Sequence, residues 1–454
     1  MTMPSRSEIQ TIDQLQLRPG STRMPAWKRF LRVGSTLLVV AVCLAYVLYN
    51  FLLAAYMVRQ LNMNDFGKFY YSTRLFLDGQ DMYGPSPATA IPVSETESRQ
   101  FLNMNPPHFH LLMLPFAAFG PRGAFLLWVA LNLIALLVNL RIIAQELRIH
   151  WTPRRVLWTS AGVLLCSATG TIAVTGQLTF LLLLPVTLAW ISARHGSWSK
   201  AAGYLGVCAS IKPFLGIFLI YLILRRDWKP VAVMAVSGAV CGITGLAIFG
   251  WTAYVNWLVA LSSVDWTWAS MNGSLAALVA RAFGENPFYT PVVSAASLIR
   301  PTTTILTLAV VGVSFRELLR NVPPSADHVF GILLLTAQLV SPLGWIYYLW
   351  LILGPAVALY RWSESRASTL RDGLALLAVP GLVIPYLFTG LWNDSALGGL
   401  TLGSIYVWTT IFLWGTLVVD WKIRANASGA RSVPVPQLPG GSICDSRRVD
   451  FVSQ

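Results

Sequence analysis

The stretch VGSTLLVVAVCLAYVLYNFLLAAYM, residues 33–57, decides the fold class of this chain. It holds no charged side chain, and about 20 apolar residues are enough for a helix to cross the hydrocarbon core of a bilayer. The 32 residues before it carry six basic and only two acidic side chains. Because Lys and Arg gather on the cytoplasmic side of membrane helices, we predict a basic cytoplasmic leader over residues 1–32, followed by a membrane anchor.

The composition of the whole chain also indicates a membrane protein. Of its 454 residues, 55% are hydrophobic and 11% are charged, and the mean hydropathy is +0.59. An ordinary soluble domain has about 25% charged residues, so a soluble globular enzyme is excluded. The net charge of +14 does not indicate a nucleic-acid partner, because the Lys residues form no block. The five Cys residues show neither paired nor metal-binding spacing, so we expect no disulfide framework and no metal site.

Nine further apolar runs are read as full membrane spans, each oriented by its flanking Lys and Arg residues. They are 125–140, 156–174, 178–191, 231–249, 302–313, 329–343, 345–360, 374–387 and 402–419. We therefore predict an all-α, polytopic membrane protein with about 12 helices, namely ten full spans plus a half-helix pair, and with both termini cytoplasmic. The membrane domain covers residues 33–424, with long outer loops at 58–124 and 251–300, and a flexible cytoplasmic tail follows at 425–454.

The half-helix pair is predicted for the run from Ala201 to Leu224. This run carries Lys212-Pro213 at its middle and ends in the basic sequence RRDWK at 225–229. A single span would put that basic sequence outside, whereas two half-length helices meeting at Lys212-Pro213 return it to the cytoplasm. Lys212 is then the one basic residue inside the membrane, where ionisable groups are functional hypotheses by default. It either meets a phosphate or pyrophosphate, or it reaches an interface or pairs with backbone carbonyls at the proline break.

The first outer loop is the most informative stretch for chemistry. Asp65 lies a few residues past the first span, among aromatic residues that include Tyr70. A carboxylate held near an alcohol can accept its proton as a general base. Arg74, nine residues on, can pair with Asp65 or contact a phosphate. The alternative is that Asp65 is solvated and merely caps a helix over Phe66–Leu77.

Three later stretches on the outer side carry further polar and aromatic groups. The apolar stretch after Pro106-Pro107 is too short to span and is predicted to form an interfacial or re-entrant helix; its His108 and His110 cannot face the same way on a helix, so a metal site is not indicated. The sequence MNGSL at 271–275, followed by Arg281, offers groups for sugar hydroxyls and a phosphate, or is a turn before an interfacial helix. The sequence SPLGWIYY at 341–348 presents aromatic side chains, which at that depth often form an interface belt.

Taken in order, these elements resemble glycosyltransferase family 87, a family of polyprenol-phosphate-sugar-dependent enzymes in the GT-C superfamily. The resemblance runs from about residue 60 to 360. It rests on Asp65 before the helix ending LDGQDMY at 77–83, Asn105-Pro106-Pro107, Leu114-Pro115, Gly176-Gln177, Lys212-Pro213 closed by Arg225-Arg226, Asn272-Gly273-Ser274-Leu275, and Ser341-Pro342 with Trp345. Where the family commonly carries His-Tyr after that Trp, this chain has Tyr347-Tyr348.

The resemblance implies a GT-C fold and a hexosyltransferase, with a mannose-like sugar carried on a polyprenyl phosphate in the bilayer. The acceptor is a lipid or lipid-linked glycan, and the active site is on the outer face of the plasma membrane. Asp65 is then the catalytic base, and no second acidic residue adjoins it as a metal clamp, so neither a metal nor another cofactor is expected. The donor phosphate is expected to bind Lys212, Arg74 and Arg281. The sugar or the acceptor is expected to contact Asn272, Ser274, Tyr70, Trp345, Tyr347 and His108.

Two alternatives to this function stay open at the level of sequence. A transporter or flippase of lipid-linked or anionic substrates would use Lys212 as a binding charge at a broken helix. The chain shows no internal repeat, whereas such transporters often do. A glycan polymerase or ligase would also take a lipid-linked donor and differs in what leaves.

Overall fold

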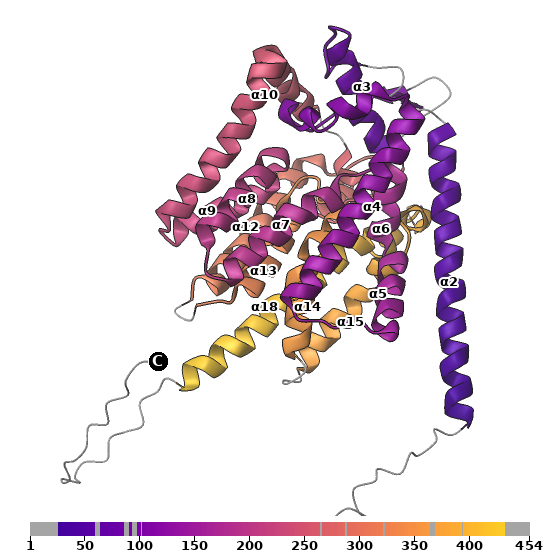
Figure 1. Cartoon of the computed structure of the whole chain (residues 1–454), viewed down its shortest axis with the longest axis vertical. Coiled ribbons are helices and arrows are strands. Elements are labelled where there is room, and N and C mark those ends of the chain that lie inside the picture. The colour runs from indigo at the N-terminus through magenta and orange to yellow at the C-terminus, as the bar shows by residue number, and fades with distance from the viewer. Residues whose placement is uncertain are drawn as a thin grey trace, which may run out of the picture.

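Helices form almost all of the structure, as the all-α prediction requires (Figure 1). The computed structural model describes residues 26–59, 64–85, 90–92, 98–100, 102–263, 266–286, 288–320, 323–363, 368–392 and 394–431. The strands are β1 (Ala90–Pro92) and β2 (Ser98–Gln100), which pair antiparallel within the first predicted outer loop. The predicted leader lies mostly outside the described residues, and α2 begins at Ala26.

Five helices in the described part of the chain contain a segment long and apolar enough to cross a membrane. They are α2 (Ala26–Arg59), α4 (Pro121–Glu146), α10 (Trp228–Ser262), α12 (Ile299–Leu318) and α18 (Ile405–Arg431). Two bent pairs raise the number to seven if each is one span: α5 (Pro153–Leu165) with α6 (Ser167–Thr175), and α15 (Thr369–Val383) with the segment Tyr386–Trp392. The protein is therefore multi-pass.

The predicted ten full spans are corrected to five to seven among the described residues. Several apolar runs form helices of 10–17 residues, including α7 (Thr179–Arg194) and α13 (Ala326–Val340). α13 is buried along almost its whole length. Such helices are apolar because they pack against other helices, so hydropathy alone counts them as spans.

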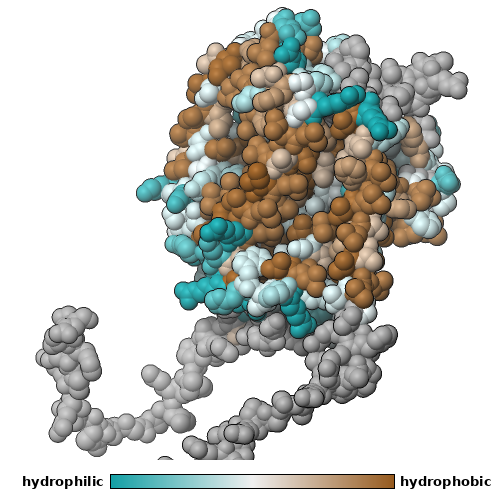
Figure 2. All heavy atoms as spheres, turned by 45° about the vertical axis from the view of Figure 1, so that its right-hand side comes forward, coloured by the Kyte–Doolittle hydropathy of each residue, from teal (hydrophilic) through white to brown (hydrophobic). Residues whose placement is uncertain are grey.

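The surface supports placement in a bilayer. In Figure 2, apolar residues cover the middle of the visible face, and hydrophilic residues gather toward its two ends. α2 stands at the edge of the bundle in Figure 1, and only 6% of its most apolar window is buried. It contacts α5 and α6, where Asn50 fills the space beside Gly170. The outward apolar side chains of α2 are thus available to lipid.

The predicted half-helix pair is confirmed. The segment consists of α8 (Trp198–Ile211), the 3-10 helix η4 (Pro213–Gly216) and α9 (Ile217–Leu224), with extended backbone at Lys212. The end of α9 returns to the start of α8, because the Arg225 guanidinium lies 5.5 Å from the Trp198 ring centroid and the Tyr221 ring lies 6.0 Å from it. The chain therefore reverses at Lys212-Pro213.

Both predicted outer loops contain helices. The first holds α3 (Asn64–Leu77), which agrees with the predicted helix, and two 3-10 helices, η2 (Pro107–Leu111) and η3 (Leu114–Ala118), in place of one interfacial helix. The second is not a loop throughout, because α10 continues to Ser262 after a kink at Gly250, whose φ is 79°. α11 (Leu275–Phe283) follows. The remaining helical segments are η5 (Trp266–Trp268), η6 (Ala296–Leu298), η7 (Ile346–Ile352), α14 (Leu353–Ser363), α16 (Tyr386–Thr389), η8 (Gly390–Trp392), α17 (Ala396–Leu400) and η9 (Leu402–Ser404).

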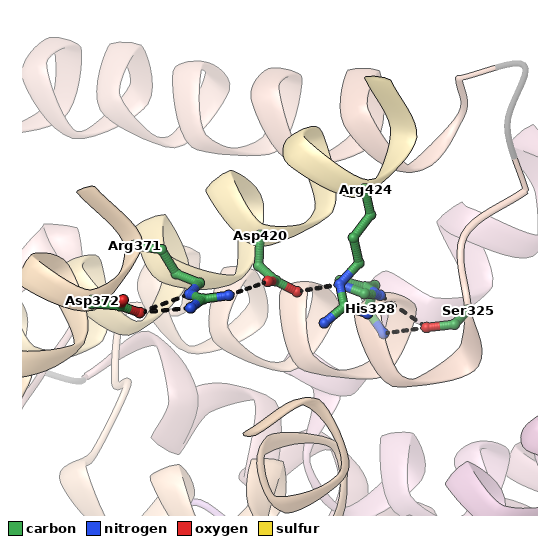
Figure 3. A network of polar contacts seen from close by, with 6 residues as sticks. All are labelled: Ser325, His328, Arg371, Asp372, Asp420 and Arg424. Atoms are coloured by element: carbon green, nitrogen blue, oxygen red, sulfur yellow. Dashed lines mark hydrogen bonds and ion pairs between the residues drawn. The ribbon is translucent and has the colours of Figure 1, made fainter. Parts of the chain in front are cut away.

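A polar network ties α13, α15 and α18 together (Figure 3). The buried carboxylate of Asp420 pairs with Arg371 at 3.1 Å, Arg424 at 2.8 Å and His328 at 3.0 Å. Ser325 Oγ lies 2.8 Å from His328 Nδ1 at the start of α13. The cavity described below meets the other end of α13, about 20 Å away along a helix of 15 residues. α18 itself extends to Arg431, beyond the tail boundary predicted at residue 425.

Candidate active site

A cavity of about 530 Å³ lies where α3, the tip of the half-helix pair and the segment 340–348 meet. This volume is in the range of ordinary ligand sites. The charged and amide side chains on its wall come from Asp65, Lys68, Asn105, Gln177 and Lys212. They come from four separate parts of the chain, so the cavity exists only in the folded protein.

Asp65 sits in the first turn of α3 and is only 6% exposed. Lys68, one helical turn on, places its Nζ 2.5 Å from Asp65 Oδ1. On the other side, Gln177 Nε2 donates a hydrogen bond to Asp65 Oδ2 at 2.5 Å. The carboxylate is therefore buried and held on both oxygens, which rules out the solvated-cap alternative. Each carboxylate oxygen has two lone pairs, so both can still accept a proton or hydrogen bond from a ligand.

Gln177 reaches Asp65 because α6 ends in a tight turn. Gly176 has a φ of 68° at the C-cap, and a Cβ there would lie 2.5 Å from that of Phe66. Glycine therefore lets α3 pack directly against this turn. Gln177 Nε2 also donates to the Tyr347 hydroxyl at 2.8 Å, whereas its buried Oε1 has no hydrogen-bond partner among the described residues. That oxygen is an acceptor aimed at no other side chain and is available to a ligand hydroxyl.

Lys212 lines the same cavity as Asp65. Its Nζ donates to Asn105 Oδ1 at 2.8 Å and lies 5.8 Å from the centroid of the Tyr348 ring. A neutral amide and an aromatic face stabilise an ammonium group without cancelling its charge. Lys68 and Lys212 together therefore give the cavity two cations against the single carboxylate of Asp65.

Trp345 and Tyr347 form part of the cavity wall, as their predicted role requires. Their rings are 6.3 Å apart at an interplanar angle of 28°. The turn that carries them is held by Asn272, whose Nδ2 donates to Pro342 O at 2.8 Å. Backbone bonds from Gly273 N to Gly344 O and from Ile346 N to Met271 O complete this contact.

Asn272 and Ser274, which were predicted to contact sugar or acceptor, support this turn and do not line the cavity. Both are fully buried. Ser274 caps α11 by accepting a hydrogen bond from Ala277 N at 3.3 Å. This stretch is therefore a turn before a helix, as the alternative predicted. The Asn272 amide supports Trp345 only through the backbone of the turn that carries Trp345.

The four other predicted contacts also lie outside the cavity wall. Arg281 is 2% exposed, and its guanidinium donates to three backbone carbonyls and to Ser404 Oγ. The exposed Arg74 donates to Ala117 O at 3.3 Å. Tyr70 and His108 bond Phe119 O and the Tyr254 hydroxyl, respectively. The structure therefore brings together Asp65, Lys212, Trp345 and Tyr347, and not Arg281, Arg74, Tyr70, His108, Asn272 or Ser274.

Four cavity residues were given no role from sequence: Lys68, Asn105, Gln177 and Tyr348. The sequence does contain a signal for Lys68, since a basic residue three positions after an acidic one is a common ion-pair spacing on a helix. Asn105 and Gln177 stand inside the short patterns of the family resemblance. Their contacts join residues 107 and 112 positions apart in the chain, which no local pattern indicates.

The fold and the cavity define a multi-pass membrane protein in which a carboxylate and two ammonium groups face one ligand-sized site. Residues 103–342, more than half of the 454 residues, match the model of glycosyltransferase family 87, and the chain belongs to this family. It is therefore a membrane glycosyltransferase. Among solved structures, it is similar to ArnT from Cupriavidus metallidurans bound to undecaprenyl phosphate, at 17% identity and a TM-score of 0.31, covering 89% of this chain and 82% of that one. No curated protein matches the chain.

Proposed function

We propose that this glycosyltransferase moves a hexose, mannose-like in kind, from a polyprenyl-phosphate donor to a hydroxyl of a lipid or lipid-linked glycan. The observation that carries the proposal is the meeting of Asp65, Lys68 and Lys212 around one cavity. Asp65 is the general base, and the two lysines hold the donor phosphate. Trp345 and Tyr347 line the side of the cavity where a sugar ring can stack.

The reaction requires one proton acceptor and stabilisation of one developing charge. The acceptor oxygen attacks the anomeric carbon and gives its proton to Asp65. The bond from that carbon to the phosphate oxygen breaks, and its electron pair leaves with polyprenyl phosphate. The phosphate changes from a diester with one charge to a monoester with up to two, so fixed cations beside it stabilise the transition state more than the bound donor.

The held position of Asp65 suits it to this role. Lys68 and Gln177 fix the carboxylate from two sides. A base that is already oriented needs no rearrangement as the acceptor hydroxyl arrives. Apolar residues on the same wall, among them Leu102 and Leu261, are compatible with the isoprenoid end of the donor.

The experiment that tests this proposal compares Asp65→Asn with Asp78→Asn. Purified full-length protein is given polyprenyl-phosphate mannose with a labelled sugar and an extract of envelope lipids, and the labelled lipid product is counted. Asp65→Asn is expected to lower the rate by about 100- to 10,000-fold, the usual contribution of a general base. Asp78 lies at the end of the same helix, with its side chain 54% exposed, and Asp78→Asn is expected to transfer at the wild-type rate. An Asp65→Asn variant that transfers like wild type would remove Asp65 as the base.

We also propose that the cavity opens to the outer face of the plasma membrane, with the segment 141–155 in the cytoplasm. The two ends of α4 give a matched pair for testing this orientation. Single-cysteine variants Arg122→Cys and Arg148→Cys, in a background without the five native Cys residues, are treated in whole cells with a thiol reagent that does not cross membranes. Labelling at 122 alone is expected, because both arginines are exposed and lie at opposite ends of α4. Labelling at 148 alone would reverse the proposed orientation.

A further inference from the structure

A chain of buried hydrogen bonds leads from Lys212 back to the helix that carries Asp65. Lys212 Nζ donates to Asn105 Oδ1 at 2.8 Å, and Asn105 Nδ2 donates to Asn103 Oδ1 at 3.2 Å. Asn103 Nδ2 lies 2.6 Å from His110 Nε2, and His110 Nδ1 lies 2.7 Å from Thr73 Oγ1. Thr73, Asn103, Asn105 and His110 are each at most 5% exposed.

Backbone groups at both ends determine which atoms donate along this chain. The backbone N–H of Asn105 donates to Asn103 Oδ1 at 3.0 Å, so the NH₂ group of Asn103 must face His110. His110 Nε2 is then an acceptor, and Nδ1 carries the hydrogen that is donated to Thr73 Oγ1. Thr73 in turn donates its own hydrogen to Phe69 O at 2.9 Å. No amide in the chain can be reversed without opposing two donors or two acceptors.

A neutral His110 is needed for this arrangement, and its surroundings supply one. Burial lowers the pKa of His110 to about 3, so the ring is uncharged at physiological pH. A charged ring would turn an Nε2–H toward the NH₂ group of Asn103. The neutral ring therefore fixes the Asn103 amide, which fixes the Asn105 amide with its oxygen toward Lys212.

This chain of hydrogen bonds also links the two sides of the cavity, the one that carries Asp65 and the one that carries Lys212. Asn103 Nδ2 donates to Ser72 Oγ at 3.1 Å, so the network meets α3 at Ser72 and Thr73, two turns beyond Asp65. Lys212 lies on a different element, at the turn of the half-helix pair. Without the Asn105 contact, its long side chain would be free to leave the cavity wall, at the gain of rotamer entropy.

We propose that Asn105 is a positioning residue that holds the Lys212 ammonium toward the donor phosphate, and that Asn103 and His110 fix the orientation of its amide. This inference rests on the proposed function, in which Lys212 binds that phosphate. Asn103 and His110 do not line the cavity, and Asn105 meets Lys212 on its wall, so all three act on the phosphate through Lys212. Their loss therefore weakens phosphate binding only while Lys212 is present.

Binding of undecaprenyl phosphate to the purified full-length protein tests this inference without knowledge of the sugar or acceptor. Lys212→Met is expected to raise the Kd at least about tenfold, and Asn105→Leu and His110→Phe about three- to tenfold each. The matched control is His150→Phe, at an exposed position, which is expected to bind like wild type. The double variant Asn105→Leu with Lys212→Met is expected to bind no more weakly than Lys212→Met alone, because both changes remove the same contact.

The outcomes separate the inference from the proposed function. If Lys212→Met binds like wild type, the assignment of Lys212 as a phosphate ligand fails, and the inference fails with it. If Lys212→Met weakens binding but Asn105→Leu does not, or if the two effects add in the double variant, only the positioning role is overturned. Should Asn105→Leu fail to fold, Asn105→Asp keeps the side-chain shape. Its carboxylate would pair with Lys212 and repel the phosphate, so unchanged binding by Asn105→Asp would overturn the inference.

Discussion

Gln177 offers the sharpest test of how Asp65 is held. Gln177→Leu keeps a side chain of similar size at a position that is 4% exposed, and it removes the donor that lies 2.5 Å from Asp65 Oδ2 and 2.8 Å from the Tyr347 hydroxyl. A hydrogen bond to a charged group contributes about 1.5–3 kcal/mol. If that amount is lost in the transition state, the rate of transfer falls by about 10- to 150-fold.

The loss is expected in kcat and not in donor binding, because Asp65 acts on the acceptor proton and not on the phosphate. The assay is the transfer of labelled sugar over a range of donor concentrations, together with the Kd for undecaprenyl phosphate. Gln145→Leu, on an exposed position of α4, is the matched control and is expected to behave like wild type. A Gln177→Leu variant with wild-type kcat would refute the claim that this amide orients the base. A rise in the KM for the donor with an unchanged kcat would place Gln177 in the donor site instead.

Three further outcomes follow from the buried polar groups. Arg281→Met is expected to lower the midpoint of thermal unfolding, because each buried carbonyl that loses its donor costs about 1–3 kcal/mol. The folded fraction is expected to bind undecaprenyl phosphate with an unchanged Kd. A raised Kd with an unchanged midpoint would restore Arg281 as a phosphate ligand. Asp420→Asn is expected to cost about 3–5 kcal/mol, since it leaves Arg371 and Arg424 without their shared carboxylate, and an unchanged unfolding midpoint would contradict this. The pKa of His110 is lowered to about 3 in the folded state. The free energy of unfolding is therefore expected to fall by up to about 1.4 kcal/mol per pH unit as the pH drops from 6.5 toward 3, and to be independent of this group above pH 6.5. Unfolding midpoints of wild type and His110→Phe that fall equally with pH would refute this.

The chain reversal at Lys212-Pro213 was predictable because charge pattern and backbone chemistry agree there. Proline removes a backbone hydrogen bond and kinks or breaks a helix, and the basic sequence at 225–229 requires an even number of crossings before it. Asp65 could be singled out as a candidate for a similar reason, since it lies just past the first span among aromatic residues, and its role as the base stays a prediction. Both signals are local and can be read from a short stretch.

The sequence was least informative where a residue's contacts depend on distant partners. An arginine in a loop with few acids suggests a phosphate ligand, whereas Arg281 donates to the backbone carbonyls of Trp268, Ala269 and Asn272, which no sequence pattern reveals. The number of spans was overestimated because apolar residues cover both lipid-facing helices and short helices buried inside the bundle. Hydropathy measures transfer from water and does not distinguish these two surroundings.

The position of the phosphate group of a bound donor lipid tests the central claim most directly. A cryo-electron microscopy map of the full-length protein with undecaprenyl phosphate is expected to show the phosphate in the cavity of Asp65, within about 3 Å of Lys212 Nζ. Lys68 is expected to contact the same phosphate from the other side. Density for the phosphate beside Arg154 and Arg155, which line a separate cavity at the start of α5, with the Asp65 cavity empty, would contradict the account.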